Sequence, residues 1–190
     1  MSTAVKFTSA DLALMPDDGK RYEIIEGELY VSRQPSSEHQ YTCGRLFKAL
    51  DDWDMVTGLG RTLIAPGLIF AEDDDVAPDV IWISRERYRK ALDAAGHLHL
   101  APELVIEVLS PEKANEARDR QAKLKLYSRR GVQEYWIVSW MSQFVEVYVR
   151  ESAELHLIAT LNSSDVLSSP LLPGFSCRVA KLFLSSIDYR

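Results

Sequence analysis

Cysteine and histidine are scarce in this chain. Its 190 residues include only two cysteines and four histidines. Cys43 and Cys177 stand far apart and have neither a metal-binding nor a redox spacing. The sequence therefore argues against a structural zinc site, and it predicts two reduced thiols in a cytoplasmic protein.

Long hydrophobic runs and glycine-rich phosphate loops are also missing. No stretch is long and apolar enough to predict a transmembrane helix, and the N-terminal sequence MSTAVKFTSADL lacks the apolar core of a signal peptide. We therefore expect no contact with a membrane. The absence of a GxxxxGKS or GxxxxGKT pattern argues against a machine driven by ATP or GTP.

Basic residues are fewer than acidic residues. Lysine and arginine total 22 residues against 28 aspartates and glutamates, which gives a formal net charge of −6 at pH 7. Extended, nonspecific binding of nucleic acid depends on many contacts between basic residues and phosphates. The acidic net charge therefore argues against this kind of binding. A local basic cleft remains compatible with the sequence, because basic residues cluster in 84–90 and in 118–130.

The order of the apolar segments predicts a single α/β domain over residues 1–190, a length that suits one core. Helices are expected at a short segment capped by Ser9, over 39–53 with Ser36 or Ser37 as its cap, and over 114–130, ending at Gly131. Strands are expected in 21–34 as a hairpin, and in 76–84, 104–109, 134–140, 144–151 and 154–161. Helices between the early strands and hairpins after them predict a mixed central β-sheet flanked by helices.

Two lysines of the helix expected over 114–130 have different predicted environments. Successive side chains advance by about 100° around a helix axis, which places Lys123 within the apolar arc and Lys125 on the opposite, solvated face. Lys123 must therefore pass its stem along the core and bring its ammonium group to a carboxylate. One interpretation is an ion pair with Asp119, one turn earlier in the same helix.

Two acids lie in or beside apolar strands. Glu107 occupies the middle of the apolar run LVIEVL, and Asp79 precedes VIWIS. Each has an ordinary explanation, since an arginine could neutralise Glu107 and an aspartate after proline commonly caps a turn. A divalent metal would explain both acids and Lys123 together, because Mg²⁺ takes one or two protein carboxylates and phosphate oxygens. The ammonium group would then stabilise developing charge or orient the attacking water during phosphodiester hydrolysis.

At these residues the sequence resembles the PD-(D/E)XK nuclease superfamily, through Pro78-Asp79, then Glu107, then a lysine. More specifically, the chain is similar to the Uma2 family, also called DUF820, a restriction endonuclease-like domain of unknown function. The similar strings run in order over residues 20–180: RYEIIEGEL (21–29), APDV (77–80), PELVIEVLSPE (102–112), RDRQAKLKLYSRRGVQEYWIV (118–138) and VEVYV (145–149).

The resemblance implies a restriction-endonuclease-like core, with added N-terminal strands and a C-terminal hairpin, that holds Mg²⁺ or Mn²⁺. Asp79 and Glu107 would be the metal ligands and, together with Lys123, the catalytic residues. In the simple form of the motif the lysine stands two residues after the second acid. Leu109 occupies that position here, so Lys123 on the following helix is the expected replacement.

Three further residues are supporting candidates. Glu23 would add a metal ligand or bind a metal-bound water; the alternative is an edge-strand glutamate that faces solvent. His39 would contact substrate or relay a proton; the alternative is a surface histidine near a helix start. Asp119 is expected to position Lys123.

The leading hypothesis is a metal-dependent nuclease that acts on DNA, with RNA as a less favoured substrate. A homodimer formed through the hairpin of 134–149 would let two sites face two strands. The alternative, favoured by the acidic net charge and the displaced lysine, is a catalytically inactive binding or assembly module of the same fold. A metal-dependent hydrolase of a smaller phosphate compound is a third interpretation.

Overall fold

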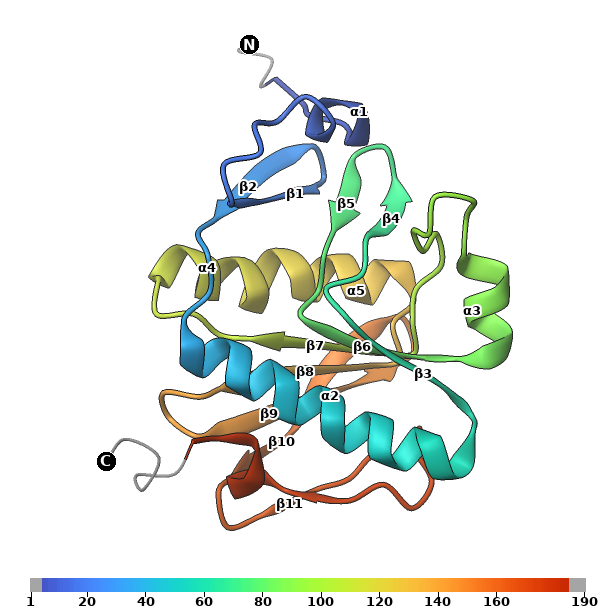
Figure 1. Cartoon of the computed structure of the whole chain (residues 1–190), viewed down its shortest axis with the longest axis vertical. Helices are drawn as coiled ribbons and strands as arrows, with labels where there is room; N and C mark the ends of the chain where they lie inside the picture. Colours follow the sequence, from blue (N-terminus) through green and yellow to red (C-terminus); the bar gives the residue numbers. More distant parts are fainter. Residues whose placement is uncertain (1–4, 185–190) are drawn as a thin grey trace.

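A central sheet of six strands organises the chain (Figure 1). The computed structural model describes residues 5–184. The strands run in the order β10-β9-β8-β7-β6-β3, and only β7 and β8 pair in parallel. Their bounds are β3 Gly60–Ile64, β6 Val80–Ser84, β7 Leu104–Val108, β8 Glu134–Ser139, β9 Phe144–Glu151 and β10 Glu154–Asn162. The predicted mixed sheet is confirmed.

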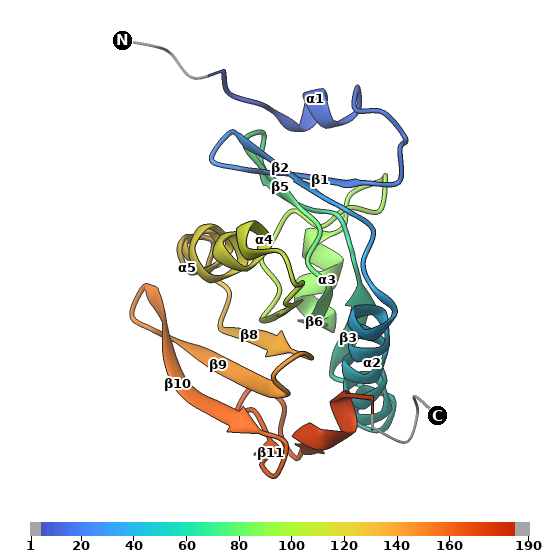
Figure 2. The same ribbon diagram turned by 90° about the vertical axis from the view of Figure 1, so that its left-hand side faces the viewer.

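Helices cover both faces of this sheet (Figure 2). On one face, α2 (Ser37–Thr57) packs Leu46 and Leu50 against β6, β7 and β8, and the C-terminal segment adds Phe175 and Leu182 to the same core. On the other face, Leu126 and Tyr127 of α5 (Leu124–Arg130) pack against the sheet. The strands β7 and β8 are therefore buried along their whole length, as their nearly continuous apolar sequences predict.

A second sheet of four strands, in the order β2-β1-β5-β4, lies at the N-terminal end of the molecule (Figure 1). Its strands are β1 Arg21–Ile25, β2 Glu28–Ser32, β4 Leu68–Ala71 and β5 Asp74–Val76. Arg129 and Arg130 both bind the buried Asp74 carboxylate, at 2.6 and 2.5 Å, so α5 is tied to this sheet. The predicted N-terminal hairpin is confirmed.

The helix ends follow local capping rules. Ser36 caps α2 by accepting a hydrogen bond from the backbone of His39 at 3.3 Å, and Gly58 ends it in the left-handed region at φ +65°. In the first helix, α1 (Ser9–Leu12), the capping residue is Thr8, so the prediction of Ser9 was wrong. The carboxylate of Asp11 binds Thr8 in return, which fixes the start one residue earlier than the serine suggested.

The helix predicted over 114–130 is confirmed, but it contains a wider turn. It consists of α4 (Lys113–Ala117), a π-helical segment η1 (Arg118–Lys123) and α5, and it ends at Gly131 with φ +89°. The remaining elements are α3 Arg85–Ala91, β11 Val166–Leu167, β12 Cys177–Arg178 and the 3₁₀ turn η2 Val179–Leu182.

Within residues 5–184, none of the helices has the length and apolar character needed to cross a bilayer. The expectation about the N-terminal sequence depends in part on residues 1–4, which lie outside the described residues.

Candidate active site

Asp79 and Glu107 face each other across the end of one strand ladder. Val80 of β6 pairs with Ile106 of β7, so the next position of this register places Asp79 opposite Glu107. The backbone N–H of Val108 donates to Asp79 Oδ2 at 2.9 Å, which ties the two strand ends together. Side chains at opposed positions share a face of the sheet, so the two carboxylates belong to one site.

The carboxylate of Glu107 is buried against the helix above it. Its Oε1 accepts hydrogen bonds from Lys123 Nζ and from the Tyr127 hydroxyl, each at 2.8 Å. Within residues 5–184, both hydrogen bonds that Glu107 accepts reach Oε1, so Oε2 keeps its lone pairs for another partner.

The π-helical segment brings Lys123 fully into the core. Its ammonium group lies 2.8 Å from Glu107 Oε1, 2.9 Å from Glu23 Oε1 and 4.0 Å from Asp119 Oδ1. Burial alone would lower the pKa of Lys123, but Glu107 and Glu23 raise it, so the ammonium group stays protonated. Lys125 is exposed and pairs with Glu26 at 3.0 Å. The predicted contrast between the two lysines is confirmed.

Asp119 contributes less to the position of Lys123 than expected. Its nearest cation is Arg118, whose Nε lies 2.9 Å from Asp119 Oδ1, whereas Lys123 lies at 4.0 Å. Arg118 also pairs with Glu23 at 3.3 Å. The pair of Asp119 with Lys123 exists, but the two glutamates are the closer partners of the lysine.

The side chain of Glu23 is buried beside Lys123. The alternative interpretation, an edge-strand glutamate that faces solvent, was therefore wrong. Glu23 lies on β1, which is an inner strand of the second sheet. Its Oε1 accepts a hydrogen bond from the backbone of Ala77 at 3.0 Å, and Arg21 donates to the carbonyl oxygen of Ala77 at 3.1 Å. Through these bonds β1 holds the loop that carries Asp79.

Acidic and basic groups are equal in number in this cluster. Four buried carboxylates meet three permanent cations and one imidazole, namely Glu23, Asp79, Glu107 and Asp119 against Arg21, Arg118, Lys123 and His39. Burial, assisted by the negative charges of Asp79 and Asp119, raises the pKa of Glu107 to about 8 despite the attraction of Lys123. A divalent cation at Glu107 would therefore displace a proton at neutral pH.

Asp79 is charged and well bound. Its Oδ1 accepts from Arg21 at 3.0 Å, and its Oδ2 lies 3.3 Å from His39 Nε2. Burial would raise the pKa of this carboxyl, but His39 and Arg21 hold the pKa well below its usual range. An ion bound to Asp79 would therefore share the carboxylate with the Arg21 guanidinium.

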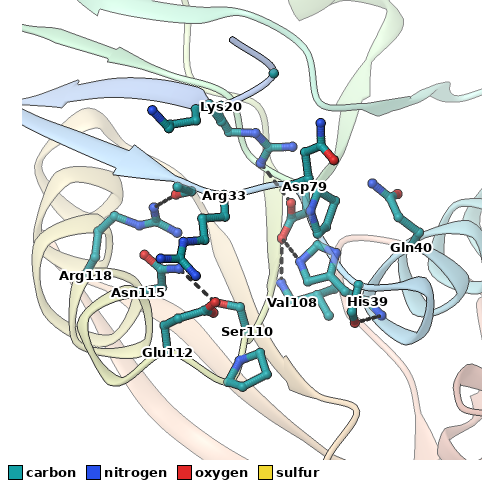
Figure 3. Close-up of a pocket in the computed structure, with 17 residues that line it drawn as sticks. Lys20, Arg33, His39, Gln40, Asp79, Val108, Ser110, Glu112, Asn115 and Arg118 are labelled. Atoms are coloured by element: carbon teal, nitrogen blue, oxygen red, sulfur yellow. Dashed lines mark hydrogen bonds and ion pairs between the residues drawn. The ribbon is translucent and has the colours of Figure 1, made fainter.

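A cleft of about 390 Å³ opens above Asp79 (Figure 3). His39 and Gln40 of α2 line one side, and Arg33 and Arg118 line the other, with Asp79 between them. Its basic lining residues are Lys20, Arg21, Arg33 and Arg118. Asp79 and His39 thus border the cleft, whereas the residues that line it do not include Glu107 or Lys123.

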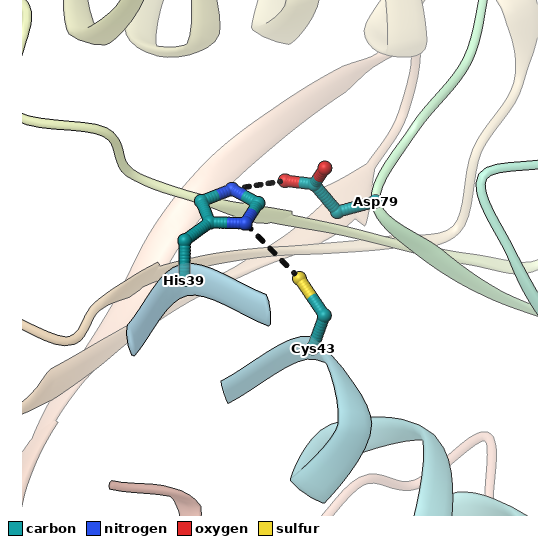
Figure 4. Close-up of side chains that lie close together, drawn as sticks. All are labelled: His39, Cys43 and Asp79. Atoms are coloured by element: carbon teal, nitrogen blue, oxygen red, sulfur yellow. Dashed lines mark hydrogen bonds and ion pairs between the residues drawn. The ribbon is translucent and has the colours of Figure 1, made fainter. Parts of the chain in front are cut away.

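His39 also contacts a thiol (Figure 4). Its Nδ1 lies 3.5 Å from Cys43 Sγ, and potential ligand atoms of His39, Cys43 and Asp79 all lie within 4.8 Å of one another. Burial strongly raises the pKa of the Cys43 thiol, which keeps it neutral, and only the thiolate is a good metal ligand. The three groups therefore form a hydrogen-bonded row, and the alternative of a surface His39 was wrong because the side chain is buried.

The donor set at Asp79 and Glu107 fits a hard cation. Both are carboxylates, the class of ligand that Mg²⁺ and Mn²⁺ prefer. Glu107 Oε2 is free of protein hydrogen bonds within the described residues.

Comparison with known proteins decides the family. The sequence profile described as "Uma2: Putative restriction endonuclease" matches residues 9–180. The chain belongs to the Uma2 family. Its structure is similar to a crystal structure of a putative nuclease belonging to DUF820 from Anabaena variabilis, with a TM-score of 0.75 and 19% identity over 93% of this chain and 97% of that chain. At this identity the likeness concerns the fold. No curated protein sequence matches the chain.

Sequence reasoning missed four residues of this Uma2 site: Arg21, Cys43, Arg118 and Tyr127. For Cys43 a signal existed, because it follows His39 by four residues in a helix and such residues share a face. Tyr127 likewise follows Lys123 by four residues. Arg21 and Arg118 gave no local signal, since their partners lie on distant segments.

Proposed function

We propose that this Uma2 protein is a metal-dependent nuclease that hydrolyses phosphodiester bonds of DNA and, as a less favoured substrate, of RNA. The observation that carries the proposal is the opposed pair Asp79 and Glu107 at the end of the β6–β7 ladder, beneath a cleft with arginines in its walls. Membership of a family described as a restriction endonuclease supports the reaction class.

In this proposal Asp79 and Glu107 hold Mg²⁺ or Mn²⁺. When bound, such an ion polarises the phosphoryl oxygen and lowers the pKa of a coordinated water. Glu107 would offer Oε2, because Oε1 is engaged by Lys123 and Tyr127. Asp79 would offer the oxygen that faces the cleft.

Lys123 acts on Glu107 as a positioning residue in this scheme. Its side chain is fully buried, and its ammonium group pairs with the carboxylates of Glu23 and Glu107. Lys123 therefore fixes the orientation of Glu107 and stabilises its negative charge. Glu23 fixes the lysine in turn and anchors the loop of Asp79 through Ala77.

His39 is the residue best placed to handle a proton. It borders the cleft beside Asp79, and the pKa of its imidazole is raised, because Asp79 outweighs the opposing effect of burial. Arg33 is exposed at the rim, and no carboxylate pairs with it within residues 5–184, so it is available to a phosphate.

Calorimetry with Mn²⁺ and a plasmid-cleavage assay test the proposal. We expect wild type to bind Mn²⁺ and to cut DNA, Asp79→Ala and Glu107→Ala to lose both properties, and Glu116→Ala, an acid outside the cluster, to keep both. Wild type that binds Mn²⁺ but cuts neither DNA nor RNA would contradict the nuclease assignment.

One observation favours the alternative of a catalytically inactive binding module. Arg21, His39 and Val108 already occupy both oxygens of Asp79, so the cluster is partly satisfied by the protein itself. Failure to bind Mn²⁺ at all, with nucleic-acid binding retained, would select this alternative.

Self-association remains a prediction, but the hairpin expected to provide its edge strands was the wrong one, because β8 and β9 are both inner strands of the sheet. β10 is the edge strand, and it exposes Leu157 and Ile158. Pairing of two β10 strands would extend the sheet across a dimer. Size-exclusion chromatography coupled to light scattering tests it, with Ile158→Lys expected to return a dimer to the monomer.

A further inference from the structure

A second cleft lies between α2 and the C-terminal segment. Its volume is about 570 Å³. The charged residues that line it are Arg45, Lys48, Asp52, Arg178 and Lys181, so four cations meet one acid. We call these four basic side chains and the cleft between them the α2 groove. A concentration of positive charge is unexpected in a chain whose net charge is −6.

The positive charge of the α2 groove is mostly uncompensated. Lys48 pairs with Asp52 at 2.8 Å, but Arg45, Arg178 and Lys181 form no ion pair within residues 5–184. The longest basic run of the sequence, 118–130, behaves differently. Each of its cations pairs with a carboxylate: Arg118, Arg120, Lys123, Lys125, Arg129 and Arg130. The run that looks most basic in sequence is neutralised, whereas three cations of the groove have no carboxylate partner within residues 5–184.

The guanidinium group of Arg45 has a fixed orientation. Its Nε donates to the carbonyl oxygen of Lys181 at 2.8 Å, which joins α2 to η2. This bond fixes the guanidinium and leaves its two Nη groups without a carboxylate partner in the described part of the chain. A preorganised guanidinium loses little entropy when it binds a phosphate.

The α2 groove and the cleft of Asp79 border the same helix on different sides. His39 lies in the first turn of α2, and a helix rises about 1.5 Å and turns about 100° per residue, so Lys48 lies roughly 14 Å farther along the axis and about half a turn around it. The red C-terminal segment lies beside α2, where Lys181 accepts the hydrogen bond of Arg45 (Figure 1). At about 3.4 Å per nucleotide along one strand, a nucleic acid that leaves the cleft and crosses the exposed side of α2 spans at least about four nucleotides before it reaches Lys48.

We infer that the α2 groove binds the phosphate backbone of the nucleic acid whose scissile phosphodiester occupies the cleft. The inference rests on the proposed function and adds a second contact region to it. Trp53, which also lines the groove, packs against Trp82 and Phe175 in T-shaped arrangements and donates from Nε1 to the carbonyl oxygen of Pro173, so its ring is fixed in place.

Binding measured at two substrate lengths tests the inference. The double variant Arg178→Gln with Lys181→Gln removes two exposed cations of the groove. Fluorescence anisotropy in the presence of a chelator follows binding of labelled single-stranded DNA without metal-dependent cleavage. We expect affinity for a twenty-nucleotide strand to fall on the order of tenfold at low salt, and the slope of log K against log salt to shrink by about 1.4, since each phosphate contact contributes about 0.7. Affinity for a trinucleotide should not change.

The matched control is Arg85→Gln with Arg89→Gln on α3, which removes the same charge at the other end of α2 (Figure 1). It should leave both affinities unchanged. Equal losses in the two double variants, or an unchanged salt slope in the groove variant, would overturn the inference while the nuclease proposal stands. Wild type that binds neither oligonucleotide would overturn both.

Discussion

Lys123 Nζ and Glu107 Oε1 lie 2.8 Å apart, and both side chains are buried between β7 and the helical segment above it. An ion pair in such a place is stable only when the remaining charges are also compensated, because removal of each ion from water costs several kcal/mol. Here Glu23 adds a second carboxylate to the same ammonium group, at 2.9 Å. Lys123 is therefore the central cation of the site.

We predict that Lys123→Met destabilises the protein strongly. The substitution leaves Glu23 and Glu107 buried with one cation fewer, which costs about 3–5 kcal/mol when a buried pair is broken. Lys125→Met, two residues along the helix, removes an exposed lysine and should cost less than about 1 kcal/mol. Urea denaturation of the two variants at neutral pH in the presence of a chelator measures the difference. Similar small losses in both would mean that the buried cluster carries little net charge.

Glu107→Gln should change how stability depends on pH. The pKa of Glu107 is about 8 in the folded protein against an ordinary value of 4.5, so the folded state binds more protons than the unfolded state between these values. Stability contributed by this group is complete below pH 4.5 and is lost as the pH rises toward 8. The pKa values of Asp79 and Glu23 are lowered and that of Lys123 is raised, so these three neighbours do not titrate within this window.

The measurement compares urea midpoints of wild type and Glu107→Gln from pH 6 to pH 8.5, in the presence of a chelator. Wild type should lose stability over this range, and the variant should lose less, because glutamine keeps an oxygen acceptor for Lys123 and Tyr127 without the charge. Parallel curves for the two proteins would show that Glu107 is ionised throughout. The control Glu116→Gln changes a glutamate outside the cluster, where Arg120 pairs with the carboxylate at 2.8 Å, and its curve should follow that of wild type.

In the proposed function, Arg21 would compete with a metal ion for Asp79. Its Nη1 lies 3.0 Å from Asp79 Oδ1, so a divalent cation at this carboxylate meets a positive charge a few ångströms away. We predict that Arg21→Gln tightens Mn²⁺ binding on the order of tenfold, because even well-screened repulsion at such a distance exceeds 1 kcal/mol for a divalent ion. Calorimetry provides the measurement.

Arg120→Gln is the control for this effect. Arg120 pairs with Glu116 and Glu146 outside the cluster and should not influence the ion. Weaker Mn²⁺ binding in Arg21→Gln would indicate that the guanidinium orients Asp79 toward the ion and that its repulsion is the smaller effect.

The sequence was sufficient to predict which segments form buried strands and which lysine turns inward. The apolar runs around Asp79 and Glu107 read as buried strands, and the helical period placed Lys123 on the core side of its helix; both predictions are confirmed. The spacing of apolar residues within one helix or strand predicts well which of its side chains are buried, because this pattern is local to that element.

The partners of these residues were harder to predict. Asp119 seemed the natural partner of Lys123 because it lies one turn earlier, yet Glu107 and Glu23 are nearer. The π-helical segment changes the local geometry, and Arg118, its neighbour in sequence, binds Asp119. Contacts between β1, β7 and η1 depend on how two sheets and a helix pack, and no local pattern contains that information.

The row Asp79–His39–Cys43 allows a last prediction about where the ion binds. Burial keeps the Cys43 thiol protonated, and a hard cation prefers carboxylates, so Cys43→Ala should leave the affinity for Mn²⁺ unchanged while Asp79→Ala abolishes binding. Co²⁺ provides a spectroscopic check, because a thiolate ligand would add an intense near-ultraviolet charge-transfer band. We expect wild type and Cys43→Ala to give the same Co²⁺ spectrum. A band that disappears in Cys43→Ala would instead place the ion against α2, with His39 and Cys43 as its ligands, and Glu107 would then serve only to compensate the charge of Lys123.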